Sequence, residues 1–155
     1  MHLHKYEKIW LSLGGLALIA FLVVLGVNAF AMGSHPPSHM AYVDPTKVDQ
    51  TAPFDKPGLV QIGDNEYDLN MTAFVFGYGP AQIEIPKGAK VHFNVTSKDV
   101  AHGFSIPGTN VNMMVLPGHV NSVTHTFDQA GEFLILCNEY CGVAHHMMMS
   151  NIVVK

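Results

Sequence analysis

The sequence predicts a β-sandwich domain that follows a single N-terminal membrane helix. A long uncharged apolar run lies near the N-terminus, and short stretches of β-branched or alternating residues, separated by Pro and Gly turns, fill the rest. The second part shows no amphipathic helical period, which favours packed sheets over a mixed fold. With 155 residues, the chain has room for one domain of ordinary size and one anchor.

The apolar run covers residues 9–32, which contain no charged side chain. As a helix this run is roughly 36 Å long, enough to cross a bilayer core of about 30 Å. Lys5 and Lys8 precede the run, whereas residues 33–43 carry no charge. The positive-inside rule therefore places residues 1–8 in the cytoplasm and the C-terminal domain on the outer side.

A cleaved signal peptide is the alternative, because Ala29-Phe30-Ala31 fits a small-x-small cleavage site. The apolar run is longer than the 7–15 residues usual for such a peptide, which favours a retained anchor. Residues 33–55 hold four prolines and read as a linker and domain entry, so we expect the folded domain over residues 56–155.

Short strands follow from about residue 59 onward. Apolar and polar residues alternate over 82–85, 91–96 and 123–127, which is typical of strands with one buried face. Residues 133–136 are all apolar and follow a turn, which indicates a core strand. We also expect a strand in the second half of residues 66–76 and a last one over residues 151–154.

Charge excludes one class of partner. Only 13% of the residues are charged, the chain contains no arginine, and its formal net charge is −4. A nucleic-acid-binding protein needs a basic patch or stripe, so we expect no nucleic acid as a partner.

Residues 137–148 carry the chemistry. They hold both cysteines of the chain, two histidines and two methionines. Thiolate and thioether are soft ligands that suit copper, zinc or iron–sulfur clusters, and imidazole suits copper well. A hard cation would need several carboxylates, and this stretch offers only Glu139.

Several sites fit such a stretch. The C-x3-C pair alone also fits a disulfide, two buried thiols, or a copper chaperone or thiol–disulfide protein, although the helical periods of a thioredoxin-like scaffold are missing. Cys141, His145 and Met148 have the spacing of a mononuclear blue-copper loop, which takes a second histidine from elsewhere. Cys137 is one thiolate too many for that site, but two thiolates could bridge two copper ions. Zinc also accepts two cysteines and two histidines, although the added methionine favours copper.

The run C-N-E-Y-C-G-x-x-H-x-x-M over residues 137–148 resembles the dinuclear CuA motif of subunit II of haem–copper cytochrome c oxidases. Residues 97–104 resemble the segment that supplies the first histidine of that family, and residues 73–78 and 116–118 also match. The whole chain most resembles the short subunit II of the ba3-type branch.

This resemblance implies a cupredoxin-like Greek-key β-sandwich and a specific ligand set. Cys137 and Cys141 would bridge both copper ions, and His102 and Met148 would complete one of them. The other copper would take His145 and the backbone carbonyl of Glu139. Only the family spacing selects these ligands, because His146, Met147 and Met149 crowd the motif.

Three further residues gain candidate roles from the resemblance. Phe76 and Tyr78 match an aromatic segment near the docking site for cytochrome c, although ordinary core packing also explains them. Glu7 matches a carboxylate associated with proton entry from the cytoplasm, although it is equally well an exposed charge beside Lys8.

The implied function is electron entry into a terminal respiratory oxidase. The chain would be a subunit of cytochrome c oxidase that takes electrons from cytochrome c, or a similar donor, at the CuA centre. It would pass them to haem in subunit I, which holds haem and CuB and reduces oxygen to water. The resemblance implies a single-pass protein of a prokaryotic plasma membrane with the copper domain on the outer face. A membrane-anchored mononuclear blue-copper carrier is the alternative.

Overall fold

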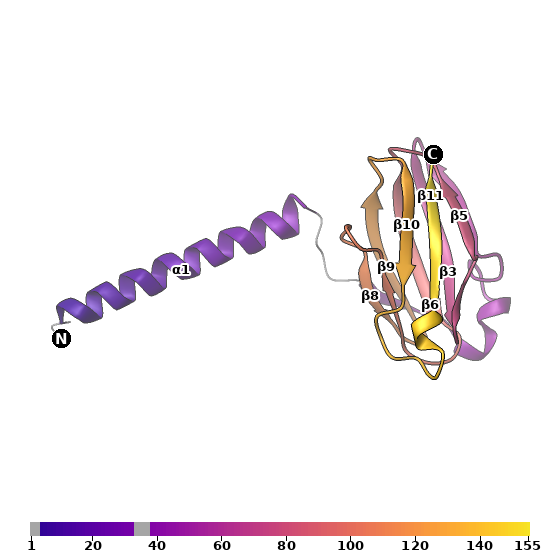
Figure 1. Ribbon diagram of the computed structural model, residues 1–155, viewed down its shortest axis with the longest axis horizontal. Coiled ribbons are helices and arrows are strands. Elements are labelled where there is room, and N and C mark those ends of the chain that lie inside the picture. The colour runs from indigo at the N-terminus through magenta and orange to yellow at the C-terminus, as the bar shows by residue number, and fades with distance from the viewer. Residues whose placement is uncertain (1–3, 33–37) are drawn as a thin grey trace. The chain divides into compact units, whose positions relative to one another are not determined.

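The computed structural model describes residues 4–32 and 38–155 and divides the chain into two compact units, Met1–His35 and Pro36–Lys155 (Figure 1). The first unit contains one helix and the second contains two β-sheets. The fold class predicted from the sequence, an all-β sandwich with one N-terminal apolar helix, is confirmed.

Helix α1 spans Lys5–Phe30, and none of its side chains is buried. Its length and composition are sufficient to cross a membrane. The helix begins before the predicted span of 9–32 and so includes Glu7, whose carboxylate accepts a hydrogen bond from the backbone N–H of His4 at 2.7 Å. A carboxylate in the first turn is favourable because it satisfies a free N–H and complements the helix dipole.

One sheet has six strands, which pair in the order β1-β9-β6-β3-β2 with β4 added to β3. β3 and β6 are parallel and stay in register from Glu66↔Lys90 to Ala73↔Ser97, without a break. The other pairings in this sheet are antiparallel. The strands are β1 (Ser38–Tyr42), β2 (Gly58–Gly63), β3 (Glu66–Phe74), β4 (Gly77–Gly79), β6 (Lys90–Ser97) and β9 (His119–Thr126).

The other sheet has five strands in the order β5-β11-β10-β7-β8, and only β11 and β5 are parallel. Figure 1 shows β10 and β11 side by side in this sheet. The strands are β5 (Gln82–Ile85), β7 (His102–Ser105), β8 (Asn112–Val115), β10 (Gly131–Leu136) and β11 (Met149–Val154).

The core lies between the two sheets. Phe93 of β6 is fully buried and contacts Phe104 of β7 and Phe127, with ring centroids 5.7 and 6.2 Å away. Each buried side chain of this size stabilises the fold by roughly 1.5–3 kcal/mol through burial of apolar surface. The alternation predicted over residues 91–96 places Val91, Phe93 and Val95 on this inner face.

Part of the segment for which the sequence predicts a linker belongs to the second unit. β1 pairs with β9, and a 3-10 helix, η1, spans Pro45–Gln50. Asp44 caps η1 by accepting a hydrogen bond from the N–H of Thr46. Val48 is buried in a small cluster with Val43 and Phe54.

The two sheets differ at one end of the sandwich. β7 and β10 are neighbours but share only one register pair, Leu136↔Ser105, so their backbone ladder does not continue beyond it. The chain leaves β10 there, forms the short 3-10 helix η2 (His145–Met147) and returns as β11. Figure 1 shows η2 at the end of the sandwich opposite the C-terminus.

Candidate metal centre

Two free, buried cysteines lie at the end of β10. Cys137 is the first residue after β10, and Cys141 follows in the loop that leads to η2. Their sulfur atoms are 3.8 Å apart. Because Cys137 directly follows the last residue of β10, the sheet fixes its position, and not the loop alone.

His102 meets these sulfurs from the neighbouring strand. His102 is the first residue of β7 and is completely buried. One ring nitrogen of His102 and the sulfurs of Cys137 and Cys141 all lie within 4.8 Å of one another. His102 Nε2 contacts Asp99 Oδ1 at 2.7 Å, whereas Nδ1 is buried and has no hydrogen-bond partner. A buried, unpaired ring nitrogen beside two thiols is the arrangement expected of a metal ligand.

The remaining predicted ligands surround the same two sulfurs. Met148 Sδ lies 3.5 Å from Cys141 Sγ, and His145 Nδ1 lies 3.5 Å from the same sulfur. The carbonyl oxygen of Glu139 lies 3.1 Å from Cys137 Sγ. The structure thus brings together all six donor groups that the resemblance implies.

The crowded motif divides into inward and outward residues. Met148 is 2% exposed and faces the sulfurs, whereas its neighbours Met147 and Met149 are 66% and 54% exposed. His145 is half-buried beside Cys141, and His146 is exposed. The short 3-10 helix produces this division, because three residues per turn separate His145 and Met148 by one full turn.

Gly103 allows the strand and the ligand loop to approach closely. A Cβ atom at this position would lie 2.0 Å from Asn138 Oδ1 and 2.5 Å from the Asn138 backbone nitrogen. The Gly103 N–H donates a hydrogen bond to Cys137 Sγ at 3.3 Å. This bond lies just beyond Leu136↔Ser105, the one register pair between β7 and β10, so it takes the place of a further backbone bond between these strands.

Asp99 organises the histidine side of the site. Besides His102, its carboxylate accepts hydrogen bonds at 2.6 Å from the backbone N–H groups of Val75 and Val100. Burial alone would raise the pKa of Asp99, but the hydrogen bonds from His102 and the two amides outweigh it and lower the pKa. The ionised carboxylate therefore orients the His102 ring and links it to the loop after β3.

The environment keeps Cys141 protonated when no metal is bound. Burial, followed by the nearby Cys137, raises the pKa of Cys141 to about 11. A metal must displace this proton, because the thiolate is the form that binds metal ions.

The other predicted site residues lie outside the sulfur cluster. Phe76 has a positive φ of 98° and is 39% exposed, and its ring lies against Gly142 of the ligand loop. Tyr78 is only 3% exposed and donates a hydrogen bond to the Gly103 carbonyl at 2.5 Å. Burial and the nearby cysteines raise the pKa of Tyr78 well above its usual range, so the phenol stays protonated. Glu7 lies in α1, in the other unit.

Sequence reasoning missed three contributors to this site: Asp99, Gly103 and the hydroxyl of Tyr78. One signal was present, because metal-binding histidines commonly hold a carboxylate on the second ring nitrogen and Asp99 lies three residues before His102. Nothing local in the sequence indicated the contact between Tyr78 and Gly103.

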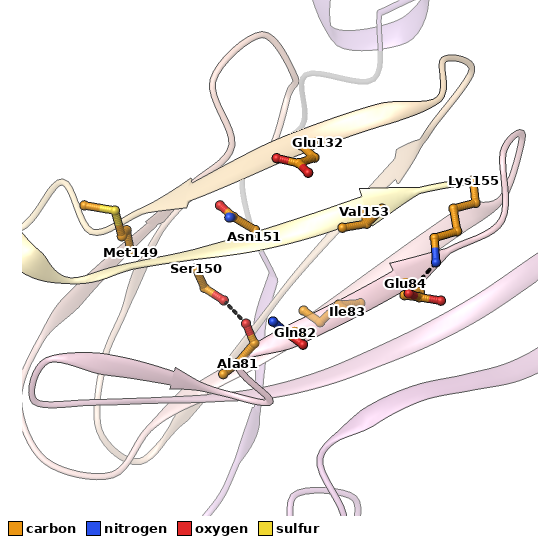
Figure 2. Close-up of a pocket in the computed structure, with 10 residues that line it drawn as sticks. All are labelled: Ala81, Gln82, Ile83, Glu84, Glu132, Met149, Ser150, Asn151, Val153 and Lys155. Atoms are coloured by element: carbon orange, nitrogen blue, oxygen red, sulfur yellow. Dashed lines mark hydrogen bonds and ion pairs between the residues drawn. The ribbon is translucent and has the colours of Figure 1, made fainter.

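A shallow surface pocket lies on the solvent face of β5, β10 and β11 (Figure 2). Figure 2 shows Ser150 bonded to the Ala81 carbonyl and Lys155 paired with Glu84 across it. None of the six predicted donor groups lines this pocket, so it is separate from the sulfur cluster.

The donor set decides which metal fits. Two thiols, two imidazoles, one thioether and one carbonyl form a soft set, and the unpaired Nδ1 of His102 leaves a nitrogen free to bind. Such a set fits copper and does not fit magnesium or calcium, which take oxygen ligands.

Comparisons with known proteins point to one family. The family described as cytochrome c oxidase subunit II, periplasmic domain, matches residues 65–155. A cytochrome c oxidase subunit 2 from Thermus thermophilus is 43% identical over 97% of this chain and 92% of its own length.

Solved structures agree. One chain in the cryo-EM structure of a haem–copper terminal oxidase dimer superposes with a TM-score of 0.81 at 32% identity, covering 97% of this chain and 100% of the other. The periplasmic domain of subunit II of cytochrome oxidase from Bradyrhizobium japonicum has a TM-score of 0.53 at 21% identity, covering 57% of this chain and 83% of its own, which shows a shared fold.

Proposed function

The chain belongs to the cytochrome c oxidase subunit II family, and on that premise we propose that it is the electron-entry subunit of its oxidase, with a dinuclear copper centre. It would accept electrons from cytochrome c, or a similar donor, and pass them to haem in subunit I, where oxygen is reduced to water. The nearly full-length match to the Thermus relative agrees with the short ba3-type subunit that the sequence resembles.

The convergence of six donor groups on one pair of sulfurs supports this proposal most strongly. Cys137 and Cys141 would bridge two copper ions, and their 3.8 Å separation leaves both sulfurs facing the same small volume. His102 and Met148 would serve one copper, and His145 and the Glu139 carbonyl the other. Two copper ions held in this way would supply a one-electron couple shared between the metals.

The protein's own residues keep the donors in place. Cys137 and His102 are attached to neighbouring strands of one sheet, and Met148 directly precedes β11. Asp99 fixes the ring of His102, and Gly103 donates its N–H to Cys137. A scaffold that hardly moves when an electron arrives favours electron transfer over substrate chemistry.

The soluble unit tests the number of copper ions. A fragment beginning at Pro36 should fold and bind copper, because α1 lies in the other compact unit. We expect two coppers per chain and an EPR spectrum split by two equivalent nuclei. One copper per chain with a single-nucleus spectrum would support the mononuclear blue-copper carrier instead, and zinc in place of copper would exclude both.

The membrane assignment rests on α1 and its flanks. We propose that α1 anchors the chain with its N-terminus in the cytoplasm and the copper domain on the outer face, because Lys5 and Lys8 precede the apolar run. The intact mass of the mature protein from native membranes tests this. Loss of residues 1–31 would show a cleaved signal peptide.

Phe76 is the candidate for contact with the electron donor. Its partly exposed ring covers Gly142, beside Cys141, so a donor that touches Phe76 would approach the metal centre closely. Tyr78 is buried and would support this segment from within. Phe76→Ala should slow electron entry from cytochrome c and leave the copper content unchanged, as measured by stopped-flow mixing and metal analysis.

Glu7 is the candidate for proton entry. Its carboxylate already accepts the N–H of His4, so a helix-capping role competes with this proposal. Glu7→Gln keeps a capping oxygen but removes the charge, and it should slow turnover of the assembled oxidase without changing the copper centre. Unchanged turnover across a range of pH would leave Glu7 as a helix cap.

A further inference from the structure

Tyr78 is a buried polar group that the proposed electron transfer does not use. Its ring packs edge-on against Phe104, with centroids 5.5 Å apart at 86°, and its hydroxyl points to a backbone oxygen in the core. A buried phenol hydroxyl needs a hydrogen-bond partner, and a side chain that is only 3% exposed cannot contact a docked protein directly. The role of Tyr78 therefore depends on which partner its hydroxyl holds.

The partner of this hydroxyl is the residue that touches the sulfur. Tyr78 donates to the carbonyl of Gly103 at 2.5 Å, and the N–H of the same Gly103 donates to Cys137 Sγ at 3.3 Å. Gly103 lies opposite Met114 in the ladder between β7 and β8, and on the side away from β8 its N–H and carbonyl bond to Cys137 and Tyr78. Here both of its backbone polar groups have fixed partners.

The surroundings make this contact hard to replace. Gly103 lies against the backbone nitrogens of Asn138 and Glu139, at a distance that leaves no room even for a methyl group. The ladder between β7 and β10 has ended at Leu136↔Ser105, so it does not fix Gly103 against Cys137. Tyr78 reaches the carbonyl of Gly103 from β4, a strand of the other sheet.

We propose that Tyr78 is a positioning residue for the metal centre: by holding the Gly103 carbonyl, it aims the Gly103 N–H at Cys137 Sγ and so raises the reduction potential of the copper bound there. An N–H bond to a ligand sulfur withdraws electron density from it, which favours the reduced metal. The inference rests on the proposed copper centre for its redox consequence. The two hydrogen bonds from Tyr78 to Gly103 and from Gly103 to Cys137, called the clamp below, exist without metal.

Tyr78→Phe tests the clamp, because it removes only the hydroxyl. In the copper-loaded soluble domain we expect the equilibrium constant for reduction to fall at least threefold, where tenfold corresponds to about 59 mV for a one-electron couple. Tyr67→Phe is the matched control, because it removes the same hydroxyl group from a tyrosine far from the site. Tyr67 lies on β3, about 20 Å along that strand from Ala73, which pairs with Tyr78. It should leave the potential unchanged.

A second control separates the clamp from general loosening of the core. Phe127 packs against Phe93 in the core, and its backbone bonds to Gly88 and Ala89. Phe127→Leu should lower the unfolding midpoint without changing the reduction potential. If Phe127→Leu shifts the potential as much as Tyr78→Phe does, or if Tyr78→Phe lowers stability alone, the proposal is overturned.

Amide hydrogen exchange of Gly103 in the metal-free domain tests the clamp without copper. Tyr78→Phe should accelerate exchange of this amide more than that of Leu136, a partly buried residue at the end of β10. Equal exchange rates of the Gly103 amide in wild type and variant would contradict the clamp, even if the reduction potential shifted. Failure of the wild-type domain to bind copper would reject the proposed function, while the exchange result would still decide the clamp.

Discussion

The two sheets of the sandwich are built from similar strands but differ in what they carry. In the six-stranded sheet, β6 pairs without interruption with β3 on one side and with β9 on the other. In the five-stranded sheet, β7 and β10 pair at a single position, and beyond it Gly103 of β7 bonds to the sulfur of Cys137 instead of to the β10 backbone. His102, Cys137 and Met148 lie at or next to the ends of strands in the second sheet, and no predicted ligand lies in the first.

This difference teaches where a fold can hold a metal site. Continuous ladders satisfy backbone groups and leave side chains to pack, whereas a ladder that stops leaves backbone groups, such as the Gly103 N–H, free to bond to a ligand sulfur. The six-stranded sheet also carries a polar cluster on one face, where Glu66 contacts both Lys90 and His92. We therefore expect changes in the two sheets to separate metal binding from stability.

The largest effect should come from Cys141→Ser. An alcohol is a poor bridge between soft metal ions, so the two-nucleus EPR pattern should disappear, while circular dichroism should show an intact fold because Cys141 belongs to neither sheet. His146→Ala, on the exposed neighbour of His145, should leave the spectrum unchanged. Loss of the centre in His146→Ala, but not in His145→Ala, would show that the ligand register is wrong.

Phe93→Ala in the six-stranded sheet should have the opposite pattern. Removing this fully buried ring should lower the free energy of unfolding by about 3–5 kcal/mol, measured by urea denaturation of the metal-free domain. Phe93→Leu should cost less, because it leaves a smaller cavity. A changed copper spectrum in the folded Phe93→Ala protein would mean that the two sheets are not separable.

Met148→Leu should have a smaller effect within the metal centre. A thioether is a weak ligand that tunes the potential more than it holds the metal, so we expect two coppers to remain and the reduction potential to shift. Voltammetry of the soluble domain measures this. Met147→Leu, on a side chain that is 66% exposed, is the control, and an equal shift in both would argue against Met148 as a ligand.

Glu66→Gln should have the smallest effect. Hydrogen bonds from Lys90, and then from His92, lower the pKa of Glu66 below its ordinary value of 4.5. A carboxylate with a lowered pKa stabilises the fold above about pH 4.5, and this contribution is lost as the pH falls through the lowered pKa.

Thermal unfolding of the variant should therefore depend less on pH in that acidic range, although the pair is surface-exposed and weak. Glu84→Gln breaks the ion pair with Lys155 on the five-stranded sheet and serves as the comparison. Identical pH profiles for Glu66→Gln and wild type would show that the polar cluster does not contribute to the stability of the fold.

Local periodicity predicted much of the fold. The alternation over residues 91–96 and the apolar run over residues 133–136 correspond to β6 and β10. β6 has one buried face as predicted, but in β10 only Ile135 is buried and Leu134 is 39% exposed, so apolar character predicted the strand and not its burial. β7 was missed because its residues, His102 to Ser105, are few and do not alternate. β1 was missed because its segment is rich in proline and its pairing partner lies far along the chain in β9.

The site was predictable in type but not in detail. Soft side chains within one short loop indicate copper, since ligand chemistry is local. The choice between His145 and His146 depends on how η2 turns, and spacing alone does not fix it. The position of Asp99, three residues before His102, was a local signal, whereas the contact of Tyr78 with Gly103 joins two segments far apart in the sequence and leaves no local pattern.

The 3.8 Å separation of the two sulfurs also has a consequence for assembly of the protein. If the domain lies on the outer face of the membrane, as proposed above, two adjacent thiols would be in a compartment where disulfides form and persist before any metal arrives. Transfer of two electrons and two protons to an external oxidant, such as oxygen or a disulfide-bonded protein, would join Cys137 to Cys141 and remove both of the proposed bridging ligands at once. The short distance between the sulfurs, which suits a metal-bound site, therefore makes the metal-free protein easy to oxidise. We expect metal to be delivered while both thiols are still reduced.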